Sequence, residues 1–228
     1  MSDMTHTPIE AVIFDLDGTL IDSAAELRQA VNTALTAMGR RALAEREITA
    51  MIGDGILRLT ERALAATGGP LAEDGLERAA VAVEEAYAAL PPSSLYHGAR
   101  EILAALAERG IALGLCTNKP AEATHRILGQ LGLKGRFQAV VGGDSYPAKK
   151  PDPAPVRGLL ADLGVAPAAA AMIGDSRNDI DAGRAAGLTT VAVSYGYSTL
   201  PMLALGADWV VDHLSEVLHV LQPRLRRL

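Results

Sequence analysis

Residues 11–20 read Ala-Val-Ile-Phe-Asp-Leu-Asp-Gly-Thr-Leu, an apolar run that ends abruptly in two aspartates and a glycine. The four residues before Asp15 do not alternate with polar ones, which favours a strand buried on both faces, as in a parallel sheet. Asp15 and Asp17 are two residues apart, so in extended backbone their side chains point the same way. The stretch therefore predicts a buried strand that presents two carboxylates at its end.

Similar apolar runs recur along the chain and end at polar residues or glycine. They span residues 111–116, 137–141, 171–173 and 189–193, with a candidate sixth at 208–211. Between them, apolar residues at helical spacing predict helices over 99–108, 121–131, 154–163 and 180–186. A glycine stands where each of these helices should stop. Strands that alternate with helices predict an α/β fold with a doubly wound, Rossmann-like parallel sheet.

Residues 22–92 break this alternation. Helical patterns cover 24–38, 45–51, 56–67 and 74–90, no convincing strand is found, and Pro91-Pro92 marks the return to alternating strands and helices. We therefore predict two domains: a core of residues 1–21 and 93–228, and an inserted all-helical cap domain of residues 22–92. The two crossings, near Asp22 and Pro92, would act as hinges.

Composition narrows the class of protein. The chain has 228 residues and a formal net charge of -6, which argues against a nucleic-acid partner because a polyanion needs a basic face. The single cysteine, Cys116, excludes an intrachain disulfide and a cysteine-rich zinc site, and we interpret it as a buried strand residue. No basic apolar leader or span-length apolar stretch is found, so we expect a cytoplasmic protein with no membrane partner. The oligomeric state is not readable from the sequence.

The polar residues that follow the strands suggest a shared site, because ligands of open parallel sheets bind beyond the carboxyl ends of the strands. Carboxylates that share one cleft repel one another unless a cation lies among them, so the set predicts a divalent metal site. The residues at this edge are Asp15, Asp17, Thr117, Asn118, Asp175 and Asp179, with Lys149 and Lys150 a few residues after the third strand.

Asp-x-Asp-Gly is open to two other interpretations. Asp and Gly both favour turns, so the motif could be a turn alone. A calcium loop starting at Asp15 would need glycine at position 20, where Leu20 stands, and it would follow a helix and not a strand.

Residues 15–20, Asp-Leu-Asp-Gly-Thr-Leu, resemble the signature of the haloacid dehalogenase-like hydrolase superfamily. Residues 115–120, 149–153 and 173–179 resemble the second, third and fourth motifs of that family, in the same order and spacing. The helical insert directly after the first motif also matches. The resemblance implies an enzyme that transfers a phosphoryl group through an aspartyl-phosphate intermediate.

Within this resemblance, Asp15 corresponds to the nucleophile and Asp17 to the general acid and base. Thr117 and the backbone of Asn118 would hydrogen-bond the phosphoryl oxygens. Lys150, which directly precedes the proline of its motif, would neutralise their charge.

The resemblance also implies Mg²⁺ as cofactor, held by the Asp15 carboxylate, the main-chain carbonyl of Asp17 and Asp175. Asp179 would touch the metal through water or orient Lys150. The alternative for Asp179 is a carboxylate favoured by the N-terminal dipole of a helix.

Several features resemble the phosphoglycolate phosphatase-like branch, whose members act on 2-phosphoglycolate: Thr-Asn-Lys-Pro at 117–120, Gly-Gly-Asp at 142–144, Lys-Pro-x-Pro-x-Pro at 150–155 and Tyr-Gly-Tyr at 195–197. The absence of lysine from residues 22–92 disfavours cleavage of carbon–phosphorus bonds through a Schiff base. The presence of Asp17 disfavours cleavage of carbon–halogen bonds. Mutases that act on phosphosugars also keep both aspartates, but the insert residues with which they handle a bisphosphate sugar are not identifiable here.

A substrate such as 2-phosphoglycolate carries a carboxylate, and the insert would need a hydrogen-bond donor to bind it. Gly53, Gly55 and Arg58 are the predicted donors, because glycines let backbone amides approach a ligand. The alternative is a helix N-terminus with Asp54 as its cap and Arg58 as a solvated helical residue.

Three other functions compete with this one. A phosphatase for another small ester, such as a sugar or amino-sugar phosphate, would share nearly all these motifs. A non-catalytic binding module on this fold would be expected to lose the acidic set, which is complete here. An oxidoreductase that binds a dinucleotide would need Gly-x-Gly-x-x-Gly after the first strand, and that motif is absent.

Overall fold

A parallel sheet forms the centre of the molecule in the computed structural model, which describes residues 7–72 and 74–225. In this part of the chain the sheet has six strands in the order β5-β4-β1-β6-β7-β8, and every pairing is parallel. All the predicted runs, including the sixth, form strands, so the predicted fold class is confirmed. The strands are β1 (Ala11–Phe14), β4 (Ala112–Cys116), β5 (Ala139–Val141), β6 (Ala170–Gly174), β7 (Thr189–Val193) and β8 (Trp209–Val211).

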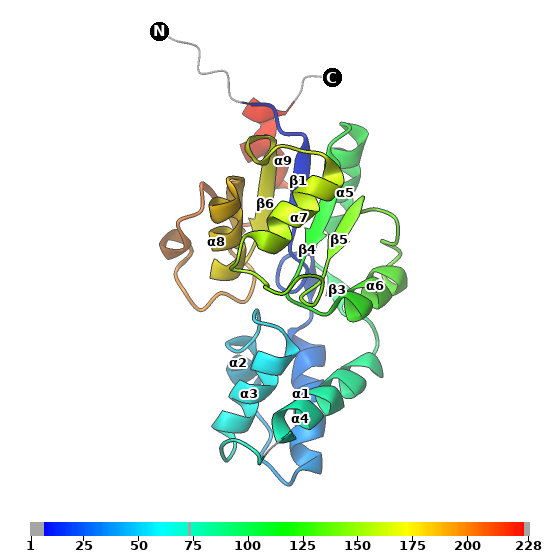
Figure 1. Cartoon of the computed structure of the whole chain (residues 1–228), viewed down its shortest axis with the longest axis vertical. Coiled ribbons are helices and arrows are strands. Elements are labelled where there is room, and N and C mark those ends of the chain that lie inside the picture. Colours follow the sequence, from blue (N-terminus) through cyan, green and yellow to red (C-terminus); the bar gives the residue numbers. More distant parts are fainter. Residues whose placement is uncertain (1–6, 73, 226–228) are drawn as a thin grey trace.

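Helices cover both faces of this sheet (Figure 1). Val12 and Phe14 of β1 belong to a core cluster shared with α5 (Ala99–Glu108) and α9 (Glu216–Leu221). Ala11 and Ile13 face the opposite cluster, with α7 (Ala154–Leu163) and α8 (Arg177–Ala186). Burial on both faces explains why the strand is apolar without alternation. The core also contains α6 (Ala121–Gln130) and 3₁₀ turns at Pro167–Ala169, Met202–Leu205 and Gln222–Arg224.

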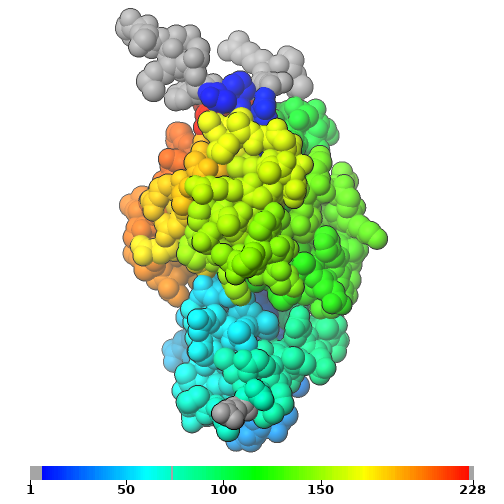
Figure 2. All heavy atoms as spheres, viewed as in Figure 1, coloured from blue at the N-terminus to red at the C-terminus, as the bar shows by residue number. Residues whose placement is uncertain are grey.

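Four helices lie together beyond the carboxyl ends of the strands (Figure 1). They are α1 (Ala24–Ala37), α2 (Glu45–Thr49), α3 (Ile56–Ala66) and α4 (Gly75–Ala88). Buried residues such as Val31, Leu59 and Val83 join them to the same apolar cluster that covers one face of the sheet. We call residues 22–92 the helical insert. Figure 2 shows the insert seated directly against the core.

A short antiparallel pair carries the chain into and out of the insert. β2 (Ile21–Asp22) pairs with β3 (Ser94–Leu95), with Ile21 opposite Leu95. The sequence did not predict this pair, because two residues are too few to show a period. The two-domain division stays a prediction, and it also includes residues 1–6, 73 and 226–228, which lie outside the described residues. Among the described helices, none has both the length and the apolarity to cross a bilayer.

Candidate active site

Three neighbouring strands bring the predicted residues to one edge. Phe14 of β1 lies between Leu115 of β4 and Ile173 of β6 in the sheet register. The residues just beyond these strand ends, among them Asp15, Thr117 and Asp175, therefore converge. All three are buried.

Lys150 lies at the centre of the acidic group. Its Nζ donates to Asp15 Oδ1 at 2.8 Å, to Asp179 Oδ1 at 2.5 Å and to the carbonyl of Cys116 at 2.5 Å. An ammonium has three donors, and these contacts use all of them. Burial alone would lower the pKa of Lys150, but the charges of Asp15 and Asp179 outweigh burial and raise it. Lys150 therefore stays protonated. The neighbouring Lys149 is exposed to solvent.

Asp179 meets two of the roles weighed from the sequence. Its Oδ2 accepts hydrogen bonds from Ser176 N at 3.0 Å and Ser176 Oγ at 2.6 Å, which completes a capping box at the start of α8. Its Oδ1 binds Lys150. Gly174 makes this packing possible, because a Cβ there would lie 2.2 Å from the Asp179 Cβ.

Three buried carboxylates form a group that suits a metal ion. Asp15, Asp175 and Asp179 each place an oxygen within 4.8 Å of the others. The pKa of Asp15 is raised from 3.8 to about 7, mainly by burial; Lys150 opposes the shift, and the charges of Asp179 and Asp17 add to it. Burial, with Asp179 and Asp15, also raises the pKa of Asp175 well above its usual value. A cation among these groups would relieve the repulsion, and carboxylate oxygens are the ligands that Mg²⁺ prefers.

The Asp17 side chain is not part of this group. It accepts a hydrogen bond from Ser23 Oγ at 2.6 Å and forms an ion pair with Lys119 Nζ at 2.9 Å. Lys119 is buried, and its Nζ lies 4.6 Å from the ring centroid of Tyr87 on α4. Lys119 was not among the predicted site residues. Its place in a strand-end motif beside Thr117 and Asn118 was the available signal.

Asn118 and Asn178 of the core form hydrogen bonds with the insert. Asn118 Nδ2 donates to the carbonyls of Gly53 at 3.0 Å and Lys150 at 3.0 Å. Asn178 Nδ2 donates to Gly53 O at 3.2 Å and Asp54 Oδ1 at 2.7 Å. The loop before α3 is thus held over the strand ends. From the sequence, only the backbone of Asn118 was assigned a role.

Cys116 is buried at the end of β4, as predicted. Burial raises the pKa of its thiol to about 11. The thiol is therefore protonated at neutral pH and is a poor nucleophile.

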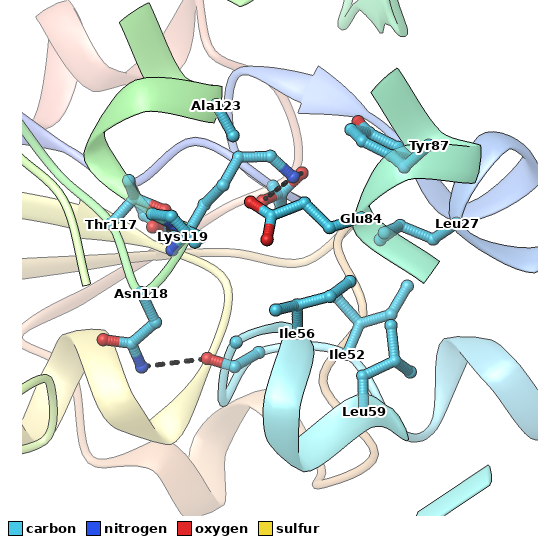
Figure 3. A pocket seen from close by; sticks show the side chains of 15 residues that line it. Leu27, Ile52, Ile56, Leu59, Glu84, Tyr87, Thr117, Asn118, Lys119 and Ala123 are labelled. Atoms are coloured by element: carbon cyan, nitrogen blue, oxygen red, sulfur yellow. Dashed lines mark hydrogen bonds and ion pairs between the residues drawn. The ribbon is translucent and has the colours of Figure 1, made fainter. Parts of the chain in front are cut away.

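A cavity of about 50 Å³ lies between the core and the insert, and Figure 3 shows its walls. Asp15, Asp17, Thr117 and Lys119 line it from the core. From the insert come mainly apolar side chains: Leu27, Ile52, Ile56, Leu59 and Tyr87, together with Glu84.

The predicted donors in the insert are only partly placed at this cavity. Gly53 and Gly55 line it, but Arg58 does not. Arg58 faces solvent with 62% of its side chain exposed, and it pairs with Glu61 one helical turn away. In this structure α3 turns Leu59, the next residue, toward the cavity, and the role of Arg58 as a ligand donor stays a prediction. Asp54 is not the helix cap; that position is Gly55, and Asp54 binds Arg62 and Asn178.

Comparisons with known proteins agree with this geometry. A family model described as haloacid dehalogenase-like hydrolase matches residues 9–187. A phosphoglycolate phosphatase of Rhodospirillum rubrum is 43% identical over 214 residues, which cover 91% of this chain and 89% of the relative.

Solved structures with a similar fold include members of the same group of proteins. A predicted phosphoglycolate phosphatase from Haemophilus somnus 129pt superposes with a TM-score of 0.89 at 32% identity, covering 96% of this chain and 99% of that one. CbbY from Rhodobacter sphaeroides, solved in complex with phosphate, gives 0.81 at 27% identity, covering 92% and 96%.

Proposed function

Because the chain belongs to the haloacid dehalogenase-like hydrolase family, we propose that it is a magnesium-dependent phosphatase that converts 2-phosphoglycolate to glycolate and phosphate. The observation that carries this proposal is the position of Asp15. Its carboxylate lies against Lys150 and lines the cavity between core and insert. A carboxylate in this place can attack a phosphate ester that the cavity holds in line.

In the first half of the reaction, an Asp15 oxygen attacks phosphorus and the bond from phosphorus to the ester oxygen breaks. Asp17, which must be protonated when the substrate arrives, gives its proton to the leaving glycolate oxygen. In the second half, a water attacks the phosphorus of the aspartyl phosphate and passes a proton to Asp17. The Asp15–phosphorus bond breaks, and both aspartates return to their starting states.

Other core residues would stabilise the charge on the transferring group. Thr117 and the backbone amide of Asn118 would donate to phosphoryl oxygens, and Lys150 holds a positive charge beside Asp15. Asp179 keeps Lys150 in position.

Mg²⁺ would be held by the carboxylates of Asp15 and Asp175 and by the main-chain carbonyl of Asp17, with Asp179 nearby. When bound, it would supply charge neutralisation for the phosphoryl oxygens. Tyr197 N donates to Asp175 Oδ2 at 2.6 Å, and this hydrogen bond would hold the carboxylate in place for that role.

The cavity favours a small substrate over a sugar phosphate. The reason is the lining, because the aliphatic side chains of the insert offer no partners for several sugar hydroxyls. A mutant of CbbY from Rhodobacter sphaeroides was solved in complex with xylulose-(1,5)bisphosphate, so a sugar phosphate is the competing candidate.

A panel of phosphate esters tests the proposal. We expect the highest kcat/KM for 2-phosphoglycolate among two-carbon, three-carbon, sugar and amino-sugar phosphates. The Asp15→Asn variant, purified from the same host by the same procedure, is the control for contaminating activity. A sugar phosphate that exceeds 2-phosphoglycolate about tenfold or more, roughly 1.4 kcal/mol, would favour the competing substrate class.

We also propose that residues 22–92 act as a cap that opens for substrate and closes over it. The contacts of Asn118 and Asn178 with the 53–54 segment support this proposal, since they join the two parts at the cavity rim. Closure would exclude bulk water from the aspartyl phosphate.

A further inference from the structure

We propose that Lys119 is the residue that binds the carboxylate of the substrate and thereby selects phosphate esters with an acidic group next to the ester carbon. This inference rests on the proposed function, because it names the part of the same site that recognises 2-phosphoglycolate.

The first support is the charge of the cavity. Among the described residues, Lys119 is the one cation that lines it. Asp15, Asp17 and Glu84 line the same space with acidic side chains. An anionic group would be repelled by these acids unless it met Lys119 directly. Lys150 approaches Asp15 but does not line the cavity, and Arg58 faces solvent.

The second support is how firmly Lys119 is held. Only 8% of its side chain is exposed, and its Nζ lies 3.0 Å from Asp17 Oδ1 and 2.9 Å from Oδ2. The ring of Tyr87 faces the same ammonium from the insert. Figure 3 shows the Lys119 side chain extended into the space bounded by Tyr87, Glu84 and Ile56. An ammonium has three N–H donors, and one carboxylate does not use all three.

The third support is distance. The ester oxygen that Asp17 protonates must lie within a hydrogen bond of Asp17, about 2.8 Å. Lys119 Nζ is also one hydrogen bond from Asp17. The ester oxygen and Nζ are therefore no more than about 6 Å apart when they share one Asp17 oxygen. In 2-phosphoglycolate the carboxylate is joined to the ester oxygen through a single carbon, so it can reach Nζ while phosphorus stays at Asp15.

A purely structural role for Lys119 is the competing explanation. In that case Lys119 only holds Asp17, and its loss would lower the hydrolysis of every ester by the same factor. A role in carboxylate binding predicts a loss that depends on the substrate. Ethyl phosphate, which has the same two-carbon chain without the carboxylate, separates the two explanations.

The test uses Lys119→Met, which removes the charge and keeps most of the chain length. We expect kcat/KM for 2-phosphoglycolate to fall about 30-fold more than kcat/KM for ethyl phosphate, about 2 kcal/mol of discrimination. Lys134→Met is the matched control, because Lys134 is an exposed lysine that does not line the cavity, and its ratio should equal that of the wild type. Equal loss for both esters in Lys119→Met overturns the inference.

A second measurement needs no variant and so does not depend on Lys119→Met folding. A crystal structure of the wild type with 3-phosphonopropionate, which replaces the ester oxygen by a methylene, should place a carboxylate oxygen within about 3.2 Å of Lys119 Nζ. A carboxylate bound elsewhere overturns the inference.

The outcomes also separate this inference from the proposed function. If the wild type does not prefer 2-phosphoglycolate to ethyl phosphate, the proposed substrate is wrong. If the wild type shows that preference and Lys119→Met retains it, the substrate stands and the role of Lys119 is wrong.

Discussion

The contacts between Asn178 and the 53–54 segment should control how tightly the insert closes. Asn178→Ala removes two hydrogen bonds between core and insert, one to Gly53 O and one to Asp54 Oδ1. Each is worth about 0.5–1.5 kcal/mol net. Together they would shift the equilibrium between closed and open forms by about 1–3 kcal/mol, a factor of about 5–150. Because only the closed form surrounds the substrate, we expect KM to rise, by at most this factor.

The control is Asn32→Ala. Asn32 also makes two amide hydrogen bonds, with Leu43 O at 2.9 Å and Leu43 N at 2.7 Å, but both partners lie within the insert. This variant should lose a similar amount of stability in urea denaturation and keep the wild-type KM.

Steady-state kinetics with 2-phosphoglycolate and small-angle X-ray scattering would measure the two effects. In the absence of ligand, Asn178→Ala should have a larger radius of gyration than the wild type and Asn32→Ala. If Asn178→Ala shows wild-type KM and wild-type scattering, the contacts of Asn178 with the 53–54 segment do not hold the insert closed, and the reasoning is refuted.

Three further predictions concern the nucleophile, the metal and a close-packed glycine. Asp15→Asn should abolish steady-state turnover and leave the thermal midpoint within a few degrees of the wild type; retained turnover would mean another nucleophile. The raised pKa of Asp15, about 7 against 3.8, means that the metal-free fold binds more protons than the unfolded chain in this window, so its contribution to stability is lost as pH rises through 7. Mg²⁺ should therefore raise the melting temperature more at about pH 8 than at about pH 5, measured by calorimetry with chelator controls; an equal shift at both values would count against metal binding at Asp15. Gly143→Ala should destabilise the fold by about 1–3 kcal/mol, because a Cβ there would lie 2.2 Å from the Asn118 carbonyl oxygen. Gly129→Ala, in open space on α6, should instead stabilise it by about 0.5–1 kcal/mol in urea denaturation; a similar loss in both variants would contradict the steric explanation.

The core of the site was predictable because it follows from one rule of parallel sheets. Asp15, Thr117 and Asp175 each stand just after an apolar strand, and strands of one sheet end at the same edge. Their convergence required only that β1, β4 and β6 be neighbours, as they are. The prediction of Lys150 did not follow from this rule, because Lys150 lies several residues after β5. It was chosen over Lys149 from its position before the proline of its motif.

The insert was harder to predict. Arg58 was a reasonable donor by charge, but the rotation of α3 about its axis decides which residue faces the cavity, and that rotation depends on packing against α4 and α1. Lys119 was overlooked because its partners, Asp17 and Tyr87, come from segments far away in sequence. The short pairing of β2 with β3 left no periodic signal at all.

By itself, the sequence determined the α/β class, the helical insert and the group of acids, because burial patterns and strand-end chemistry are local properties of the chain. Only the tertiary structure decided which side chains share the cavity, which of them are paired, and how the insert is fastened. Asn178 and Gly53, for example, are in contact although they lie 125 positions apart. No local pattern encodes such contacts, since they depend on how separately formed elements pack.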